Sequence, residues 1–163
     1  MNSDTRKARW ASTFLAVVAS FCAFSKGTLA AATFERIADL NPGPVGSFPS
    51  NITVHADALL FGAYTQATGV ELWRSDATNV VLVRDINDTA DDIGFGVKEG
   101  NDSFPAWLTL FDNKMFFSAF EPRRGGELWQ YDGVDASRVA DINPDANDTI
   151  KFLQYSSWPQ ELT

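Results

Sequence analysis

The chain of 163 residues has few of the side chains on which catalysis most often depends, since it contains one cysteine, Cys22, and one histidine, His55. It has no Gly-x-Ser-x-Gly elbow and no glycine-rich phosphate loop, which are the motifs of many hydrolases and nucleotide-binding enzymes. His55 falls in a strand-like stretch, where a lone histidine is more often a packed or surface residue than a base. The sequence therefore predicts a chain that is not an enzyme, with no catalytic residue and no cofactor.

Basic residues are also scarce, because 13 Lys and Arg stand against 21 Asp and Glu, and the formal net charge is -8. Nucleic-acid binding requires clustered positive charge, and no basic patch is visible in the sequence. We therefore expect no nucleic-acid partner. A hydrophobic content of 45% with 13% aromatic residues is typical of a globular chain.

The first thirty residues have the layout of a secretory signal peptide. Three basic residues near the N-terminus precede an apolar run from Trp10 to Phe24, and small residues follow at Ala30 to Ala32. We expect residues 1–30 to be a signal peptide that is cleaved near Ala30 to Ala32 and that carries Cys22 away. The alternative is an uncleaved membrane anchor, but a run of 15 residues is short for a span, which needs about 20. The sequence thus predicts a secreted, extracellular or cell-surface protein.

An internal repeat appears when the sequence is aligned with itself at an offset of 56, which pairs residues 47–87 with 103–143 at 15 identical positions of 41. We divide the chain into a lone closing strand and linker at 34–46, a first repeat unit with a long loop at 47–102 and a second with a loop at 103–156. The start of a truncated third unit follows at 157–163. Insertions confined to one loop are typical of stacked repeats.

Each unit contains four short runs rich in β-branched and aromatic residues, separated by Asp, Asn, Gly and Thr. This pattern predicts an all-β fold of tandem four-stranded antiparallel units, and no stretch after Ala32 has a sustained helical period. The near-continuous apolar strands favour β-propeller-like blades that are covered on both faces, in a partial or truncated array. Trp73 and Trp129 are expected to pack between blades.

The repeated motif resembles the ELWxxDGT repeat family, found in long secreted and surface-associated proteins, largely of bacteria. Its residues are Glu71, Leu72, Trp73 and Asp76 in the first unit and Glu127, Leu128, Trp129 and Asp132 in the second. Ala77 stands where the family has Gly, and Val134 where it has Thr. The resemblance implies a secreted β-repeat protein and little about activity. Because the motif recurs at equivalent sites, we expect it to be structural.

A calcium site is a candidate in the segment that begins at Asp141. Asp141, Asn143 and Asp145 alternate as oxygen ligands do at the start of an EF-hand loop. The glycine at position 6 and the acidic residue at position 12 of such a loop are missing. The alternative is that these side chains cap turns.

Four Asn-x-Ser/Thr sequons are candidates for glycosylation in a eukaryotic secretory pathway. They begin at Asn51, Asn87, Asn101 and Asn147. In a bacterium the same pattern would carry no such meaning.

These observations favour a secreted or cell-surface, non-catalytic β-repeat protein that acts as a binding or structural module, within a longer array. Its partner would be an extracellular protein or a glycan. One alternative is an extracellular propeller-type hydrolase or lyase whose active site lies in further blades. Another is a calcium-stabilised adhesin.

Overall fold

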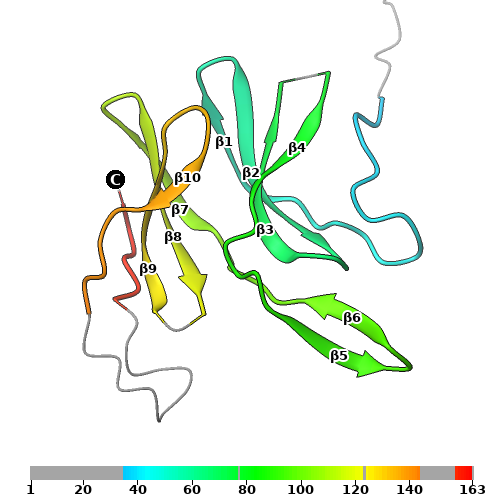
Figure 1. The fold of residues 1–163 in the computed structure, drawn as a ribbon. Helices are drawn as coiled ribbons and strands as arrows, with labels where there is room; N and C mark the ends of the chain where they lie inside the picture. Colours follow the sequence, from blue (N-terminus) through cyan, green and yellow to red (C-terminus); the bar gives the residue numbers. More distant parts are fainter. Residues whose placement is uncertain (1–34, 77, 123, 144–156, 163) are drawn as a thin grey trace, which may run out of the picture. The chain divides into compact units, whose positions relative to one another are not determined.

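The computed structural model describes residues 35–76, 78–122, 124–143 and 157–162. All regular elements in these ranges are β-strands, and all strand pairs are antiparallel (Figure 1). The expectation of an all-β fold is therefore confirmed. Nothing in the described ranges forms a helix long and apolar enough to cross a membrane.

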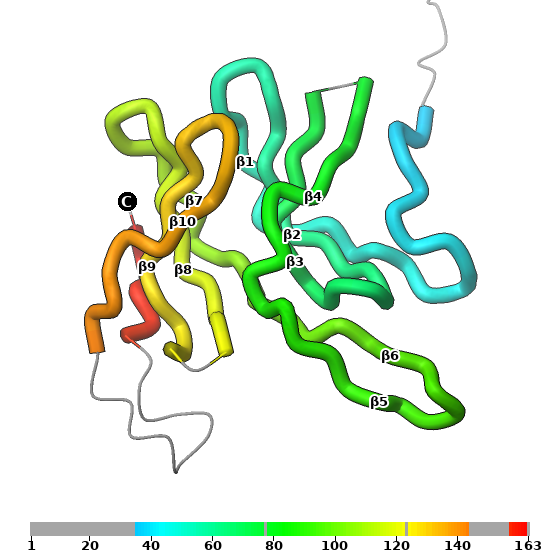
Figure 2. The backbone as a smooth tube through the Cα atoms, viewed as in Figure 1, coloured from blue at the N-terminus to red at the C-terminus, as the bar shows by residue number. Residues whose placement is uncertain are grey.

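Each repeat unit forms one four-stranded sheet in which strands that are consecutive in sequence are neighbours (Figure 2). The first sheet consists of β1 (Ser50–His55), β2 (Ala58–Thr65), β3 (Gly69–Ser75) and β4 (Val80–Arg84). The second sheet consists of β7 (Ala106–Phe111), β8 (Lys114–Glu121), β9 (Gly125–Tyr131) and β10 (Ala136–Arg138). Two tandem four-stranded antiparallel units are thus confirmed. The described strands do not close into a barrel or a propeller.

The two units repeat each other in backbone conformation as well as in sequence. The Ser-Phe-Pro segments at 47 and 103 and the Ser-Trp-Pro segment at 157 have their second and fifth residues at positive φ. These residues are Phe48 and Asn51, Phe104 and Trp107, and Trp158 and Glu161. The register between the first two strands shifts at the same place in both sheets, and Phe61 pairs with Trp73 as Phe117 pairs with Trp129. The 56-residue offset therefore relates equivalent structural positions.

The hydrophobic core lies between the two four-stranded sheets. One side of the first sheet and the opposite side of the second sheet contribute its side chains. Side chains alternate along a strand, so each sheet has a leading side and a trailing side. The leading side bears Leu59, Phe61 and Trp73 in the first unit and Met115, Phe117 and Trp129 in the second. The trailing side bears Leu60 and Leu72 in the first unit and Phe116 and Leu128 in the second. Ile86, which follows β4, belongs to the same core cluster as Leu60 and Leu72, and its equivalent in the second unit is Ile142. The core cluster combines the trailing side of the first unit with the leading side of the second. The junction is thus head-to-tail.

Two segments differ from expectation. The long loop of the first unit contains a hairpin of β5 (Ala90–Gly94) and β6 (Val97–Gly100), where the sequence pattern indicated only an irregular loop. Its strands are mostly exposed. Exposed strands need no apolar side chain at every second position, so the sequence contains no alternating pattern that would predict them. Residues 35–46 form no strand, although a closing strand was expected at 34–46. A strand requires a partner, and no described strand pairs with this segment.

Candidate functional site at the junction of the repeat units

A buried carboxylate holds the junction between the two units together. Glu71, on β3, is completely buried. Its carboxylate accepts hydrogen bonds from the N–H groups of Ile86 and Asn87 at 3.1 and 3.2 Å and from the hydroxyl of Ser103 at 2.6 Å. Burial raises the pKa of Glu71 to about 7, although these three hydrogen bonds oppose the rise. The Glu71 side chain therefore fixes both the end of its own sheet and the first residue of the next unit.

The same arrangement recurs one unit later. Glu127 is also completely buried. It accepts from the N–H of Ile142 at 3.1 Å and from the hydroxyl of Ser157 at 2.8 Å. The N–H of Ser103 donates to the carbonyl of Val70, and that of Ser157 donates to the carbonyl of Gly126, which is the position equivalent to Val70. The glutamate of the repeated motif is thus a link between consecutive units.

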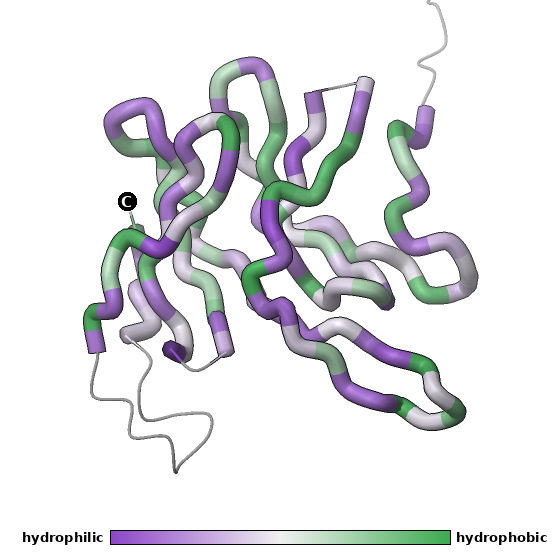
Figure 3. The backbone as a smooth tube through the Cα atoms, in the orientation of Figure 1, coloured by the Kyte–Doolittle hydropathy of each residue, from purple (hydrophilic) through white to green (hydrophobic). Residues whose placement is uncertain are grey.

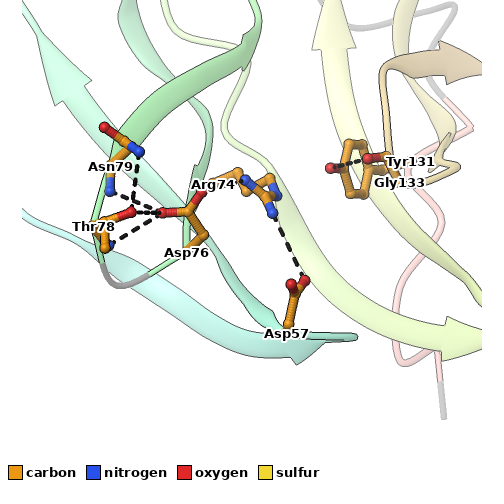
Figure 4. Close-up of polar contacts among 7 residues, drawn as sticks. All are labelled: Asp57, Arg74, Asp76, Thr78, Asn79, Tyr131 and Gly133. Carbon is orange, nitrogen blue, oxygen red and sulfur yellow. Dashed lines mark hydrogen bonds and ion pairs between the residues drawn. The ribbon is translucent and has the colours of Figure 1, made fainter.

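The aspartate of the motif closes the third hairpin of each sheet. Asp76 accepts from the hydroxyl of Thr78 at 2.8 Å and from the N–H groups of Thr78 and Asn79 at 3.1 and 2.9 Å (Figure 4). These bonds hold the pKa of Asp76 below its ordinary value. In the second unit Asp132 accepts only the N–H bonds of Val134 and Asp135, because Val134 has no hydroxyl. Both aspartates form Asx turns, so their role is structural.

Arg74 lies between two carboxylates from neighbouring hairpins. Its guanidinium is 3.3 Å from Asp76 and 3.8 Å from Asp57 (Figure 4). The nearby Tyr131 hydroxyl donates to the carbonyl of Gly133 at 2.8 Å. Because the Asp57 side chain is largely exposed, the ion pair between Arg74 and Asp57 contributes at most about 1 kcal/mol to stability. Through Arg74 these contacts connect the β1–β2 turn with the β3–β4 turn of the first sheet.

The two tryptophans and the histidine are packing residues with different surroundings. Trp129 is buried in the junction core. Trp73 is half-buried, and its indole N–H donates to the carbonyl of Ala63 at 3.1 Å. His55 is buried, donates from Nε2 to the carbonyl of Asn113 at 3.1 Å and lies edge-on to the ring of Tyr131 at 5.4 Å. His55 therefore bridges the two units.

One of the candidate calcium ligands, Asp141, lies against two arginines. Asp141 forms an ion pair with Arg124, and Arg138 lies 3.7 Å from the same oxygen. Asp145 lies outside the described residues, as does most of the candidate loop. Where the chain is described, no group of three or more His, Cys, Asp or Glu side chains could hold a metal ion. The arginines compensate the charge that a cation would otherwise neutralise.

The sequons occupy different environments. Asn87 is buried and donates to the carbonyl of Asp102 at 2.8 Å. Asn51 donates to the carbonyl of Pro105 at 3.1 Å, and Asn101 donates to the hydroxyl of Thr89 at 3.0 Å. Asn147 lies outside the described residues. Because Asn87 is only 5% exposed, attachment of a sugar there would disturb this partly buried hydrogen bond to the start of the second unit.

Sequence reasoning missed the exposed tip of the β5–β6 hairpin. Ile93, Phe95 and Val97 are exposed there, and Phe95 is 109% exposed. Phe95 has φ 54° between two glycines that are also at positive φ, a conformation that bulky residues rarely adopt. Figure 3 shows the hydrophobic turn between the two strands. The signal in the sequence was the segment Ile93-Gly-Phe-Gly-Val97, an apolar cluster inside a stretch rich in aspartate.

Comparison of the chain with protein-family models, with curated proteins and with solved structures gives no match.

Proposed function

We propose that this chain is a secreted or cell-surface, non-catalytic β-repeat protein that serves as a structural and interaction module. In this proposal its four-stranded units are propeller-like blades of the ELWxxDGT type. The observation that carries the proposal is the repeated link in which Glu71 binds Ser103 and Glu127 binds Ser157. Stacking of equivalent units accounts for the recurrence of the motif at the same place in both units, and the link gives the recurring glutamate a structural role.

The glutamate, leucine, tryptophan and aspartate of the motif each have a structural role in such a module. The glutamate of the first unit binds the serine that begins the second unit. Leu72 of the first unit and Trp129 of the second unit both pack in the core between the two units. The aspartate closes a turn. Residues with these roles specify stacking of equivalent units.

The contact surface for an external partner is the tip of the β5–β6 hairpin. Three apolar side chains, Ile93, Phe95 and Val97, are exposed there. Exposed aromatic residues on a protruding turn are typical anchors of interfaces. The partner class that fits the proposed location is an extracellular protein or a glycan with an apolar face. Secretion is supported by the signal-peptide pattern of residues 1–30.

Export and binding are tested with the full chain expressed in a secreting host. We expect the protein in the medium, with an N-terminus between Ala31 and Thr33 by sequencing. Retention in the cell with an intact N-terminus would contradict the proposed location. Binding of the secreted protein to the surface of its own cells is then compared for Phe95→Ser and for Val134→Ser. Val134 is a control because it is exposed on a different hairpin, and equal binding by both variants would exclude the tip as the contact.

A further inference from the structure

Equivalent residues of the two trailing sides differ sharply in exposure. In the first unit Ile86 is 5% exposed and belongs to the junction core, whereas its equivalent Ile142 is 53% exposed. His55 is buried against the second unit, whereas its equivalent Phe111 is largely exposed. Leu72 is fully buried and its equivalent Leu128 is half-buried. The trailing side of the second unit therefore presents an apolar surface of the kind that is covered in the first.

The leading sides show the complementary difference. Met115 is fully buried, while its equivalent Leu59 is 38% exposed. Trp129 is buried in the junction and its equivalent Trp73 is half-buried. Within the described ranges no strand packs on the leading side of the first unit. The leading side of the first unit is thus more exposed than its equivalent at Leu59 and Trp73, although Phe61, at 9%, is buried.

We infer that copies of this chain stack head-to-tail, with the leading side of one copy's first unit packed on the trailing side of another copy's second unit. A second copy of this chain is the expected partner, because the two surfaces that would meet are equivalent to the two surfaces that already pack together at the internal junction. Such a contact is heterologous, so it extends into a line or closes into a ring. The inference rests on the proposed function, since it names the partner of the stacking units.

The second unit accommodates this contact beside the segment 157–162. Ser157 is bound to Glu127, Trp158 stacks on Phe120 at 6.4 Å, and the Thr109 hydroxyl donates to the carbonyl of Leu162. Phe111, Val139 and Ile142 remain exposed next to it. The second copy would therefore contact these three side chains, while its own Ser47 would find Glu127 already occupied.

The asymmetry of the contact permits a complementation experiment. Leu59→Glu places a carboxylate on the leading side, and Ile142→Glu places one on the trailing side; both positions are partly exposed, so the fold should tolerate the change. Burial of an unpaired carboxylate opposes association. Val134→Glu is the matched control, because Val134 is 87% exposed on a hairpin outside both contact surfaces. Circular dichroism verifies that each variant remains folded.

Sedimentation velocity is measured on the full chain between about 1 and 500 μM, a range that reports weak to moderate affinities. We expect the wild type and Val134→Glu to form oligomers of increasing size, and each single-side variant to be monomeric. An equimolar mixture of Leu59→Glu and Ile142→Glu should form a dimer and nothing larger, since one intact side remains on each partner. Monomeric wild type, or a folded mixture that does not dimerise, would overturn the inference. Because purified protein is used, a failure of export affects the proposed function and leaves this test intact.

Discussion

Replacement of Glu71 by Gln should remove a pH dependence of stability that the buried carboxylate creates. The pKa of Glu71 rises from an ordinary value of 4.5 to about 7 because of burial. Because the pKa is higher in the folded state, folding favours the protonated form of Glu71. The contribution of this protonation to the free energy of unfolding is therefore complete below pH 4.5 and is lost as the pH rises through 7. Multiplying this difference by about 1.4 kcal/mol per pH unit gives about 3 kcal/mol.

The assay is urea unfolding of the wild type and Glu71→Gln at intervals between pH 4.5 and 8. Gln offers one oxygen to three donors, so the variant should be less stable at the lowest pH, by about 1–3 kcal/mol. That deficit should shrink as the pH rises, because only the wild type is penalised by ionisation. Glu35→Gln is the control, since Glu35 is exposed. A difference between wild type and Glu71→Gln that stays constant over this range would refute the reasoning.

Three further predictions concern the same units. Leu72→Ala should lower the free energy of unfolding by about 2–5 kcal/mol, while Leu128→Ala, at the half-buried equivalent position, should cost clearly less in the same urea titration; equal losses would contradict the head-to-tail junction. Asp76→Ala should lower the thermal midpoint more than Asp132→Ala, because Asp76 also accepts the Thr78 hydroxyl, and the reverse order in calorimetry would contradict this assignment. Addition of a chelator should leave the thermal midpoint unchanged, since Asp141 is paired with arginine; a lower midpoint would instead restore the calcium-stabilised alternative.

The strands and their grouping were accessible from the sequence because they depend on local patterns. Runs such as Ala58–Thr65 and Lys114–Glu121 are rich in residues that favour strands, and the turns between them contain Asp, Asn and Gly. The repeat offset then identified equivalent positions without any structure. The different environments of Trp73 and Trp129 were not accessible, because identical motifs acquire different burial from what lies beside them.

The link between units was missed for a different reason. Glu71 and Ser103 are 32 residues apart and form a hydrogen bond only because the second unit returns to the edge of the first. The recurrence of Glu beside Leu and Trp indicated a structural role, but it did not name the partner. The Ser-Phe-Pro segment recurred with it. Together, these two recurrences were the available signal.

The direction of stacking follows from the motif itself. Glu71 binds the serine that begins the following unit, so the link always points from one unit to the next along the chain. The junction core then selects opposite sides of the two sheets, since Leu72 is buried from the trailing side and Trp129 from the leading side. A structure with two identical sides could pair face to face and stop. Units with two different sides cannot cover both sides by pairing face to face. Each unit that is added covers the trailing side of the unit before it and exposes a trailing side of its own.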